Sequence, residues 1–286
     1  MIWIVLPAYN EEASLPKLLP KIDAALRGQK LDYRMVVVDD GSTDATATIL
    51  AEIGPTLPMH VVTHPINRGL GETERDGFEA VAAAAAPEDV IVRVEGDDTH
   101  DPQYIFRLID KLGEGFDVVN TSRFQPGGAQ LGVNGYRAFI SRCANLFMSV
   151  VFPVPNVRDF SCGFRAYRAQ VVQDAVEVFG NDFVQLRGLG FTSTLEMVVK
   201  LHLLGCRCAE VPFVLRYDQK ESASKMVSSI TAMGYLIMAV LYHWPFSGWA
   251  AQYRGLRQMY QENRGQAIEK FGRHTFKRAA LSRIGL

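Results

Sequence analysis

The sequence lacks several features that mark whole classes of protein. Its net charge is −1, from 30 basic and 31 acidic residues, so no excess of positive charge indicates a nucleic-acid binder. Its four cysteines form no CxxC pair of the kind that holds zinc, and the start of the chain has no secretory signal. Both observations favour reduced thiols in a cytoplasmic protein. Repeats are missing, and with 48% hydrophobic residues the chain is neither disordered nor fibrous.

The charge is distributed unevenly along the chain. Residues 251–286 carry eight Lys or Arg and two Glu, a balance of +6, which leaves residues 1–250 with a balance of −7. A basic tail on an acidic body favours an anionic partner for the tail, such as a lipid surface or phosphates. A solvated terminal helix explains the same charge equally well.

Short apolar runs alternate with amphipathic segments in the first 120 residues. Strands are predicted at 2–6, 35–38, 60–63, 90–94 and 117–120, and helices at 11–26, 43–53, 77–86 and 102–112. This alternation predicts an α/β fold with a mostly parallel central sheet and helices on both faces. After Thr121 we expect a Gly-rich loop at 125–135, helices at 136–151 and 192–204, a mixed segment at 159–167 and a strand at 207–215.

Polar side chains gather where three of the predicted strands end. The groups are Pro7–Glu11, Asp39–Ser42 and Glu95–Pro102, and the last holds four carboxylates. Each alone is compatible with an ordinary turn, but ligands of parallel sheets bind at the carboxyl ends of strands. Clustered carboxylates repel one another unless a cation or a substrate hydroxyl offsets their charge, and oxygen ligands without Cys suit Mg²⁺ or Mn²⁺. Such an ion would neutralise a leaving diphosphate. His100 in this loop is either a ligand or base, or a packing residue.

Six groups of residues stand in a characteristic order along the chain. They are Pro7–Glu11, Val36–Asp44, Asn67–Gly71, Asp97–Pro102 with Ser122–Gly128, Asp159–Tyr167, and Glu210–Pro212 with Ser224–Met226. In this order they resemble glycosyltransferase family 2, and within it the dolichol-phosphate mannose synthase-like branch. The resemblance runs from residue 2 to about 226. It implies the Rossmann-like glycosyltransferase A fold and inverting transfer of a sugar from a nucleotide sugar.

The resemblance also implies a role for each matching residue. The nucleotide-binding residues would be Pro7, Tyr9, Glu11, Asp39, Asp40, Arg68 and Gly69. The metal ligands would be Glu95 and Asp97, and the catalytic candidates are Asp97, Asp98 and Asp159. Phosphate or acceptor contacts would come from Arg123, Arg137, Arg216 and Lys225, because Arg offers phosphate a bidentate fork.

The chain departs from the family pattern in the loop Glu95–Pro102, which the resemblance implies would hold the metal and which we call the metal loop. Relatives usually have Asp at the position of Glu95 and an apolar residue at the position of Asp98. The departures affect which carboxylates bind the ion, not the expectation of an Mg²⁺ or Mn²⁺ site. The Gln-x-x-Arg-Trp motif of processive polysaccharide synthases is absent from the sequence. We therefore expect one sugar per turnover.

The predicted reaction moves one sugar from a GDP- or UDP-linked donor to a polyprenyl-phosphate-like acceptor. A phosphate acceptor is already ionised, so no strong base is needed. The alternative is the same donor chemistry with a soluble hydroxyl acceptor, for which Asp159 or Glu196 would be the base. A nucleotidyltransferase is disfavoured because no Gly-rich basic loop follows the first strand. A nucleotide-sugar-binding module without activity is disfavoured by the dense carboxylates.

The C-terminal part begins with an apolar segment. Residues 227–253 contain no Lys, Arg, Asp or Glu, and 230–244 are almost wholly apolar. A 15-residue helix covers about 22 Å, which is short of the roughly 30 Å hydrocarbon core, so we exclude a full span. We expect a catalytic domain at 1–226 and a helical extension at 227–286 that attaches to an anionic membrane surface. Trp244, Phe246, Trp249 and Tyr253 would then lie at the headgroup level. A homodimer or core helix is the alternative.

Overall fold

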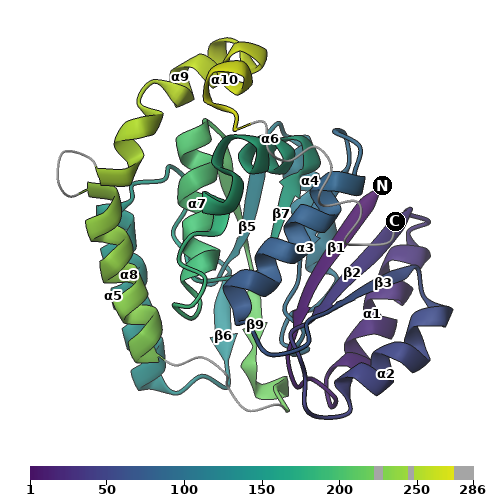
Figure 1. Cartoon of the computed structure of the whole chain (residues 1–286). Helices are drawn as coiled ribbons and strands as arrows, with labels where there is room; N and C mark the ends of the chain where they lie inside the picture. Colours follow the sequence, from purple (N-terminus) through teal and green to yellow (C-terminus); the bar gives the residue numbers. More distant parts are fainter. Residues whose placement is uncertain (222–227, 244–247, 274–286) are drawn as a thin grey trace.

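The structure, a computed structural model, describes residues 1–221, 228–243 and 248–273 (Figure 1). Its central sheet has seven strands in the order β3-β2-β1-β4-β7-β5-β8. All neighbours pair in parallel except β7, which is antiparallel to both β4 and β5. The strands of this sheet are β1 (Ile2–Ala8), β2 (Tyr33–Asp39), β3 (Met59–Thr63), β4 (Val90–Arg93), β5 (Val118–Ser122), β7 (Arg165–Arg168) and β8 (Cys208–Pro212). A second, two-stranded sheet pairs β6 (Ala129–Leu131) with β9 (Val214–Arg216).

Helices cover both faces of the central sheet, as predicted (Figure 1). In β1, Trp3 and Val5 belong to one apolar core cluster, whereas Ile4 and Leu6 belong to the other, because successive side chains of a strand point to opposite faces. The first face is covered by α3 (Leu70–Ala84), α6 (Ala169–Phe179) and α7 (Thr192–Leu204), and the second by α1 (Leu15–Gly28), α2 (Thr46–Ile53) and α4 (Tyr104–Gly113). Short 3-10 turns lie at Gly54–Thr56, Gly180–Val184 and Tyr217–Gln219.

Two predicted boundaries are wrong, and the strand β7 is not predicted. Helix α3 begins at Leu70 rather than at 77, because its first turns are polar and the apolar pattern starts only later. The expected strand at 207–215 is two strands, β8 and β9, in different sheets. The mixed segment at 159–167 leads into β7, a four-residue strand with an arginine at each end. Arg165 is buried there and donates to the carbonyl oxygens of Thr194 and Phe160. An apolar periodicity does not reveal such a strand.

The C-terminal helices pack on the same core as the sheet. Helix α8 (Ser228–His243) lies beside α5 (Gly135–Val151) at one edge of the molecule (Figure 1). Gly234 lets α8 approach α7, since a Cβ there would collide with the hydroxyl of Thr192. The 3-10 turn at Gly248–Tyr253, α9 (Leu256–Glu262) and α10 (Arg264–Phe271) continue over α6 and α7. The predicted domain boundary at residue 226 lies outside the described residues.

Two of the aromatic residues predicted to lie at lipid headgroups are packed inside the protein instead. Tyr253 is buried, and its ring centroid lies 4.9 Å from that of Phe179. The ring centroid of Trp249 lies 5.0 Å from that of Tyr242. These rings fill the space between the C-terminal turn and the core, so they do not reach a membrane surface. Trp244 and Phe246 lie outside the described residues.

Part of the basic tail also has partners within the protein. Arg264 forms two 2.6 Å hydrogen bonds to the carboxylate of Asp174, and Arg273 lies 2.7 Å from Asp182. These two ion pairs hold this part of the tail on the body of the protein. Among the described residues, no helix is both long and apolar enough to cross a membrane.

Candidate functional site

The three polar groups predicted at strand ends lie at one edge of the sheet. Strands β2, β1 and β4 are neighbours, and Ala8 pairs with Asp39 at the ends of the first two. The loops that follow are tied together, because the backbone N–H of Asn10 donates to the Ser42 hydroxyl at 2.9 Å. Gly96 lies so close to the β1 loop that a Cβ would come within 2.9 Å of the Pro7 carbonyl oxygen. The predicted binding edge is therefore a single, closely packed set of loops.

The residues predicted to frame the nucleotide base lie on the first two of these loops. Pro7 and Glu11 are buried and Tyr9 is half-buried. Asp39 is 1% exposed, and its Oδ1 accepts the backbone N–H of Ser42 at 3.1 Å. Its other oxygen, Oδ2, receives no hydrogen bond from the residues that the structure describes, which leaves an acceptor for a ribose or base donor.

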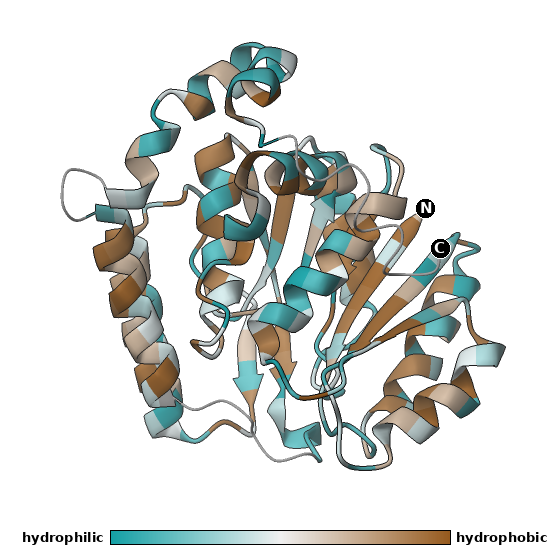
Figure 2. Ribbon diagram, in the orientation of Figure 1, coloured by the Kyte–Doolittle hydropathy of each residue, from teal (hydrophilic) through white to brown (hydrophobic). Residues whose placement is uncertain are grey.

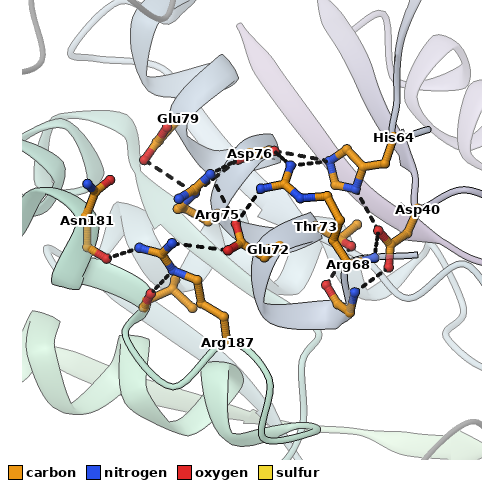
Figure 3. Close-up of polar contacts among 12 residues, drawn as sticks. Asp40, His64, Arg68, Glu72, Thr73, Arg75, Asp76, Glu79, Asn181 and Arg187 are labelled. Carbon is orange, nitrogen blue, oxygen red and sulfur yellow. Dashed lines mark hydrogen bonds and ion pairs between the residues drawn. The ribbon is translucent and has the colours of Figure 1, made fainter. Parts of the chain in front are cut away.

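Asp40 fixes the loop that precedes α3 (Figure 3). Its two oxygens accept the backbone N–H groups of Arg68 and Gly69 at 2.9 and 2.8 Å, and His64 Nδ1 lies 2.6 Å from Oδ1. Gly69 has a φ of 89°, which a residue with a side chain rarely adopts, and it caps α3. Both oxygens of Asp40 are thus engaged within the protein. We infer that Asp40 positions the 68–69 loop rather than contacting the nucleotide itself.

The guanidinium of Arg68 lies on the acidic side of α3 (Figure 3). It donates to Asp76 at 2.7 Å and to Glu72 at 3.0 Å. Glu72 also pairs with Arg187 at 3.1 Å, and a Cβ on Gly71 would come within 2.5 Å of the Arg187 Cα. The side chain of Arg68 is about one-third exposed. In this arrangement it holds α3 to the loop, and it would have to leave Asp76 and Glu72 to reach a phosphate.

In the metal loop, Asp97 is paired with a lysine that the sequence reading did not assign. Its Oδ2 forms an ion pair with Lys220, and its Oδ1 accepts the Thr99 hydroxyl at 2.6 Å. Burial alone would raise the pKa of Asp97, but the Lys220 ammonium and the Thr99 hydrogen bond hold it below its ordinary value. Asp97 is therefore an ionised carboxylate already aimed at a cation.

The other carboxylates of the loop have protein partners too. Glu95 pairs with Arg93, whose Nη2 lies 2.9 Å from Glu74, and Asp98 lies 2.5 Å from Lys21. Gly163 makes room for the Arg93 guanidinium, because a Cβ at that position would collide with it. The sequence analysis required a cation or a substrate hydroxyl to offset the repulsion within this acidic cluster. Protein cations offset its charge.

The donor set nevertheless fits a divalent ion that arrives with a diphosphate. The described residues contain no group of three His, Cys, Asp or Glu side chains placed to hold a metal. Magnesium in phosphate-transfer sites is usually held by one or two carboxylates together with waters and substrate phosphates. Asp97 and Glu95 would be the oxygen ligands of such an ion, and Oδ2 of Asp97 already pairs with a cation, the Lys220 ammonium.

Arg123 and Asp159 form a buried pair at the end of β5. Arg123 Nε and Nη2 donate to the two carboxylate oxygens at 2.8 and 2.7 Å, and the side chains are 11% and 0% exposed. Asp159 also accepts the backbone N–H groups of Arg123 and Cys162 and the hydroxyl of Ser161. Burial raises and Arg123 lowers the pKa of Asp159, with a net lowering. The carboxylate of Asp159 is enclosed and both its oxygens are occupied, which favours a structural role over that of a catalytic base.

The second candidate base has the same problem. Glu196 is fully buried, with one oxygen 2.5 Å from Lys200 and the other accepting the N–H groups of Gln185 and Leu186 at 2.9 Å each. It holds the 185–186 turn on α7. Neither predicted base of a hydroxyl-acceptor reaction is accessible to substrate.

The remaining residues predicted to contact phosphate are Arg137, Arg216 and Lys225. Arg137 of α5 is exposed and donates to the Tyr217 hydroxyl at 3.2 Å. Arg216 pairs with Asp218 at 2.9 Å, with both side chains about 40% exposed. Lys225 lies outside the described residues, so its predicted role is untested.

Comparison with known proteins identifies the family. The model of the glycosyl transferase family 2 matches residues 3–175, which is more than half of the chain. The chain belongs to glycosyltransferase family 2. This is the family that the motifs predict.

Two curated relatives are named as mannosyltransferases of lipid phosphates. The chain is 31% identical over 211 residues to a dolichol-phosphate mannosyltransferase of Pyrococcus furiosus, covering 73% of this chain and 55% of that protein. It is 31% identical over 256 residues to an undecaprenyl-phosphate mannosyltransferase of Micrococcus luteus, covering 88% and 96%. The chain thus spans about half the length of the first relative and nearly all of the second.

A solved structure shares the fold of this glycosyltransferase. Glucosyl-3-phosphoglycerate synthase of Mycobacterium tuberculosis, crystallised with Mn²⁺, UDP and glucosyl-3-phosphoglycerate, matches with a TM-score of 0.55 at 20% identity. The match covers 84% of this chain and 78% of that chain. The glycosyltransferase A fold predicted from the motifs is confirmed.

In this glycosyltransferase His100 is a packing residue. Its ring stacks on Phe164 at 5.1 Å and meets the edge of Phe213 at 5.3 Å, and it is 3% exposed. Burial lowers the pKa of His100 to about 4, so the ring is neutral at physiological pH. The backbone N–H of Glu95 donates to Nδ1 of His100 at 3.3 Å, so the ring supports the metal loop.

The residues that the motifs missed are the partners of those that they found. Lys220, His64 and Arg93 each bind a predicted site carboxylate, and none of them belongs to a motif with a local spacing. Lys220 lies 123 positions from Asp97 in the sequence. A signal was present for Arg93 alone, because an arginine inside a buried apolar strand requires an acidic partner.

Proposed function

We propose that this glycosyltransferase moves one sugar, with inversion, from a nucleoside diphosphate donor to a polyprenyl phosphate at a membrane surface, with the help of Mg²⁺ or Mn²⁺. The observation that carries the acceptor is an apolar face on α5 and α8. The nucleotide and metal assignments rest on the family and on the strand-end loops. The names of the curated relatives support a lipid phosphate acceptor.

The apolar face consists of large exposed side chains on two neighbouring helices, α5 and α8. Figure 2 shows apolar residues along the ribbon of α8. Both helices contact the core with other residues, such as Met148 of α5 and Met238 of α8. The face is made of Tyr136, Phe139, Ile140, Leu146, Phe147 and Val150 on α5 and Ile230, Met233, Leu236, Ile237 and Val240 on α8, which are 38% to 73% exposed. We call this set the α5–α8 apolar face.

A lipid leaflet suits this face better than water does. Single exposed apolar residues are ordinary, but a contiguous set of this kind marks an interaction surface. Amphipathic helices can lie in the interface plane of a bilayer with their apolar side buried in the lipid. Arg137 of α5 lies next to this face in sequence, between Tyr136 and Phe139, so it would stand at headgroup level. An acceptor phosphate at that level would meet Arg137 with its isoprenoid chain still in the lipid.

The chain's own residues do the following in the proposed reaction. The Pro7–Glu11 loop and Asp39 bind the nucleoside, and the loop that Asp40 holds lies beside them. When bound, the divalent ion supplies Lewis-acid stabilisation of the departing diphosphate, and Asp97 with Glu95 would hold it. The acceptor phosphate oxygen attacks the anomeric carbon as the bond to the diphosphate breaks with its electron pair. No protein base is required, in accord with the enclosed carboxylates of Asp159 and Glu196.

The reaction itself is tested with a matrix of donors and acceptors. The full-length protein is incubated with GDP-mannose, UDP-glucose or UDP-N-acetylglucosamine, with Mn²⁺, and with undecaprenyl phosphate in vesicles or with soluble sugar alcohols. We expect product on the lipid with one of these donors. Transfer to a soluble hydroxyl and none to the lipid would replace the proposal with the soluble-acceptor alternative.

Replacement of Asp39 is expected to weaken donor binding more than it slows the chemical step. The Asp39→Ala variant loses a base or ribose contact that is made equally in the ground and transition states, so KM should rise by about tenfold with kcat nearly unchanged. Steady-state kinetics measure both constants. Asp32→Ala is the matched control, because this exposed aspartate lies at the opposite end of β2, away from the predicted binding edge. Unchanged KM with a large loss of kcat in Asp39→Ala would contradict the nucleotide role.

Negative charge on the α5–α8 apolar face is expected to abolish membrane binding. Leu236 and Val240 lie one helical turn apart and are 54% and 59% exposed. The double variant Leu236→Glu, Val240→Glu should lower the fraction that floats with phosphatidylglycerol vesicles at least about tenfold, because it removes apolar contact and adds repulsion from anionic lipid. Flotation of the full-length chain at low salt is the measurement.

The control places the same two charges, four positions apart, on an exposed side of α2. Ala47→Glu, Ala51→Glu adds them at the opposite edge of the sheet (Figure 1), and it should float like the wild type. If the wild-type protein does not float and sediments as a dimer that the Leu236→Glu, Val240→Glu variant dissociates, the face is a subunit interface and the membrane proposal is wrong.

A further inference from the structure

Lys220 covers the side of Asp97 where a ligand cation would bind. Its ammonium forms an ion pair with Oδ2 of Asp97, and the two side chains are 11% and 16% exposed. The other oxygen, Oδ1, accepts the hydroxyl and backbone N–H of Thr99 at 2.6 and 3.2 Å. Lys220 ends the short turn at Tyr217–Gln219 that follows β9. The lysine is therefore supplied by the segment that leads from the sheet toward α8, not by the metal loop.

A divalent ion at Asp97 competes with this ammonium. The divalent ion and the Lys220 ammonium would both bind Oδ2 of Asp97. Two cations on one oxygen repel each other strongly where there is little solvent. We propose that Lys220 is an internal counter-ion of Asp97 that yields the carboxylate to the divalent ion and then binds the diphosphate which arrives with it. This inference rests on the proposed function only for the metal and the diphosphate, and it gives a role to a residue outside the family motifs.

Contacts of Lys220 also connect the metal loop with the acceptor side. Its Nζ lies 5.8 Å from the ring centroid of Tyr217. The guanidinium of Arg137 lies 5.6 Å from the same centroid, and its Nη1 donates to the Tyr217 hydroxyl at 3.2 Å. One aromatic ring thus contacts both cations. When Lys220 leaves Asp97, the surroundings of Arg137 on the apolar helix α5 change as well, so the donor and acceptor sides share one continuous set of contacts.

The competition is measured with Mn²⁺ alone, in the absence of nucleotide, sugar and lipid. Free and bound Mn²⁺ are separated by electron paramagnetic resonance during a titration of the full-length protein. Lys220→Met removes the charge and keeps the length of the side chain, and it should bind Mn²⁺ about tenfold more tightly than the wild type. Lys220→Arg retains the charge and should keep the wild-type affinity. Circular dichroism and thermal melting verify that each variant is folded.

The matched control is another lysine paired with the same loop. Lys21 lies 2.5 Å from Asp98, one residue beyond Asp97, and its side chain is 50% exposed. Lys21→Met removes the same charge from the neighbourhood of the loop and should leave Mn²⁺ affinity nearly unchanged. Equal tightening in Lys21→Met and Lys220→Met, or none in Lys220→Met, overturns the competition with the ion.

The second half of the proposal concerns the diphosphate and predicts an effect of opposite sign. With saturating Mn²⁺, calorimetry with inorganic pyrophosphate should show binding to Lys220→Met about tenfold weaker than to the wild type, because a charged hydrogen-bond donor is lost. Tighter binding of Mn²⁺ together with weaker binding of pyrophosphate in one variant is a pattern that a merely structural lysine does not produce. Unchanged pyrophosphate affinity overturns the transfer of Lys220 to the diphosphate. Neither titration contains an acceptor, so both remain interpretable if the lipid is not the substrate.

Discussion

Asp97→Asn is expected to reduce sugar transfer at least about 10³-fold while leaving the fold intact. The substitution keeps the shape of the side chain and its contact with Thr99, but it removes the negative charge that would hold the divalent ion against the departing diphosphate. Loss of a group that stabilises transition-state charge typically costs about 10²–10³ in turnover, and loss of the metal costs more. Initial rates with the best donor of the panel, at saturating acceptor, are the measurement.

The control for Asp97→Asn is an exposed carboxylate on the helix that follows the metal loop. Asp110 of α4 is exposed, and Asp110→Asn should transfer sugar at the wild-type rate. Exhaustive treatment with EDTA should match the effect of Asp97→Asn in the wild type and have little further effect on the variant. Near-normal turnover in Asp97→Asn, or full activity of the wild type after EDTA, would show that the metal assignment is wrong.

Asp159→Ala is expected to destabilise the protein by about 3–5 kcal/mol. The substitution leaves the Arg123 guanidinium in a buried place without the carboxylate that neutralises it, and breaking a buried ion pair from one side has a cost of this size. Urea denaturation followed by tryptophan fluorescence measures the change in the free energy of unfolding. Asp218→Ala is the matched control, since it breaks an Asp–Arg pair whose side chains are about 40% exposed, and it should cost about 1 kcal/mol or less.

The pH dependence gives the Asp159 prediction a second readout. Because the pKa of Asp159 is lowered in the folded protein, its ionisation stabilises the fold above the unfolded value of about 3.9. This stabilisation is lost as the pH falls through the lower folded value. The difference in stability between wild type and Asp159→Ala should therefore be constant around pH 7 and shrink only in strong acid. A stable Asp159→Ala protein with abolished turnover would instead restore Asp159 as the base of a hydroxyl-acceptor reaction.

The sequence predicts the binding edge well because its signals are local. Apolar runs such as those in β1 and β2 are continuous, and each ends in the Pro, Asp or Gly that the turn requires. Parallel strands must bring these ends to one edge, so Pro7, Asp39 and Asp97 could be placed near one another without a structure. The helical periodicity of α1 and α4 was equally visible for the same reason.

The roles of individual carboxylates were not predictable, because they depend on partners that are distant in the chain. Asp39 and Asp40 are adjacent in the sequence. Among the described residues, one oxygen of Asp39 has no hydrogen-bond donor, whereas both oxygens of Asp40 are used by the loop at 68–69. Asp159 resembles a catalytic residue by its motif and is enclosed by Arg123, 36 positions away. Which carboxylate is accessible is decided by tertiary packing, and the local pattern carries no record of it.

The loop that Asp40 holds enters the binding reaction already ordered. Two backbone N–H groups are fixed by one carboxylate, and His64 bridges that carboxylate to Asp76 of α3, with its Nε2 3.1 Å from the Asp76 carboxylate. Immobilising a loop on binding costs conformational entropy that subtracts from affinity, and a pre-organised loop avoids that loss. In the proposed function, a nucleotide beside this loop would meet a surface that is already ordered. Discrimination between donors would then depend on the shape of that surface rather than on how readily the loop folds around the ligand.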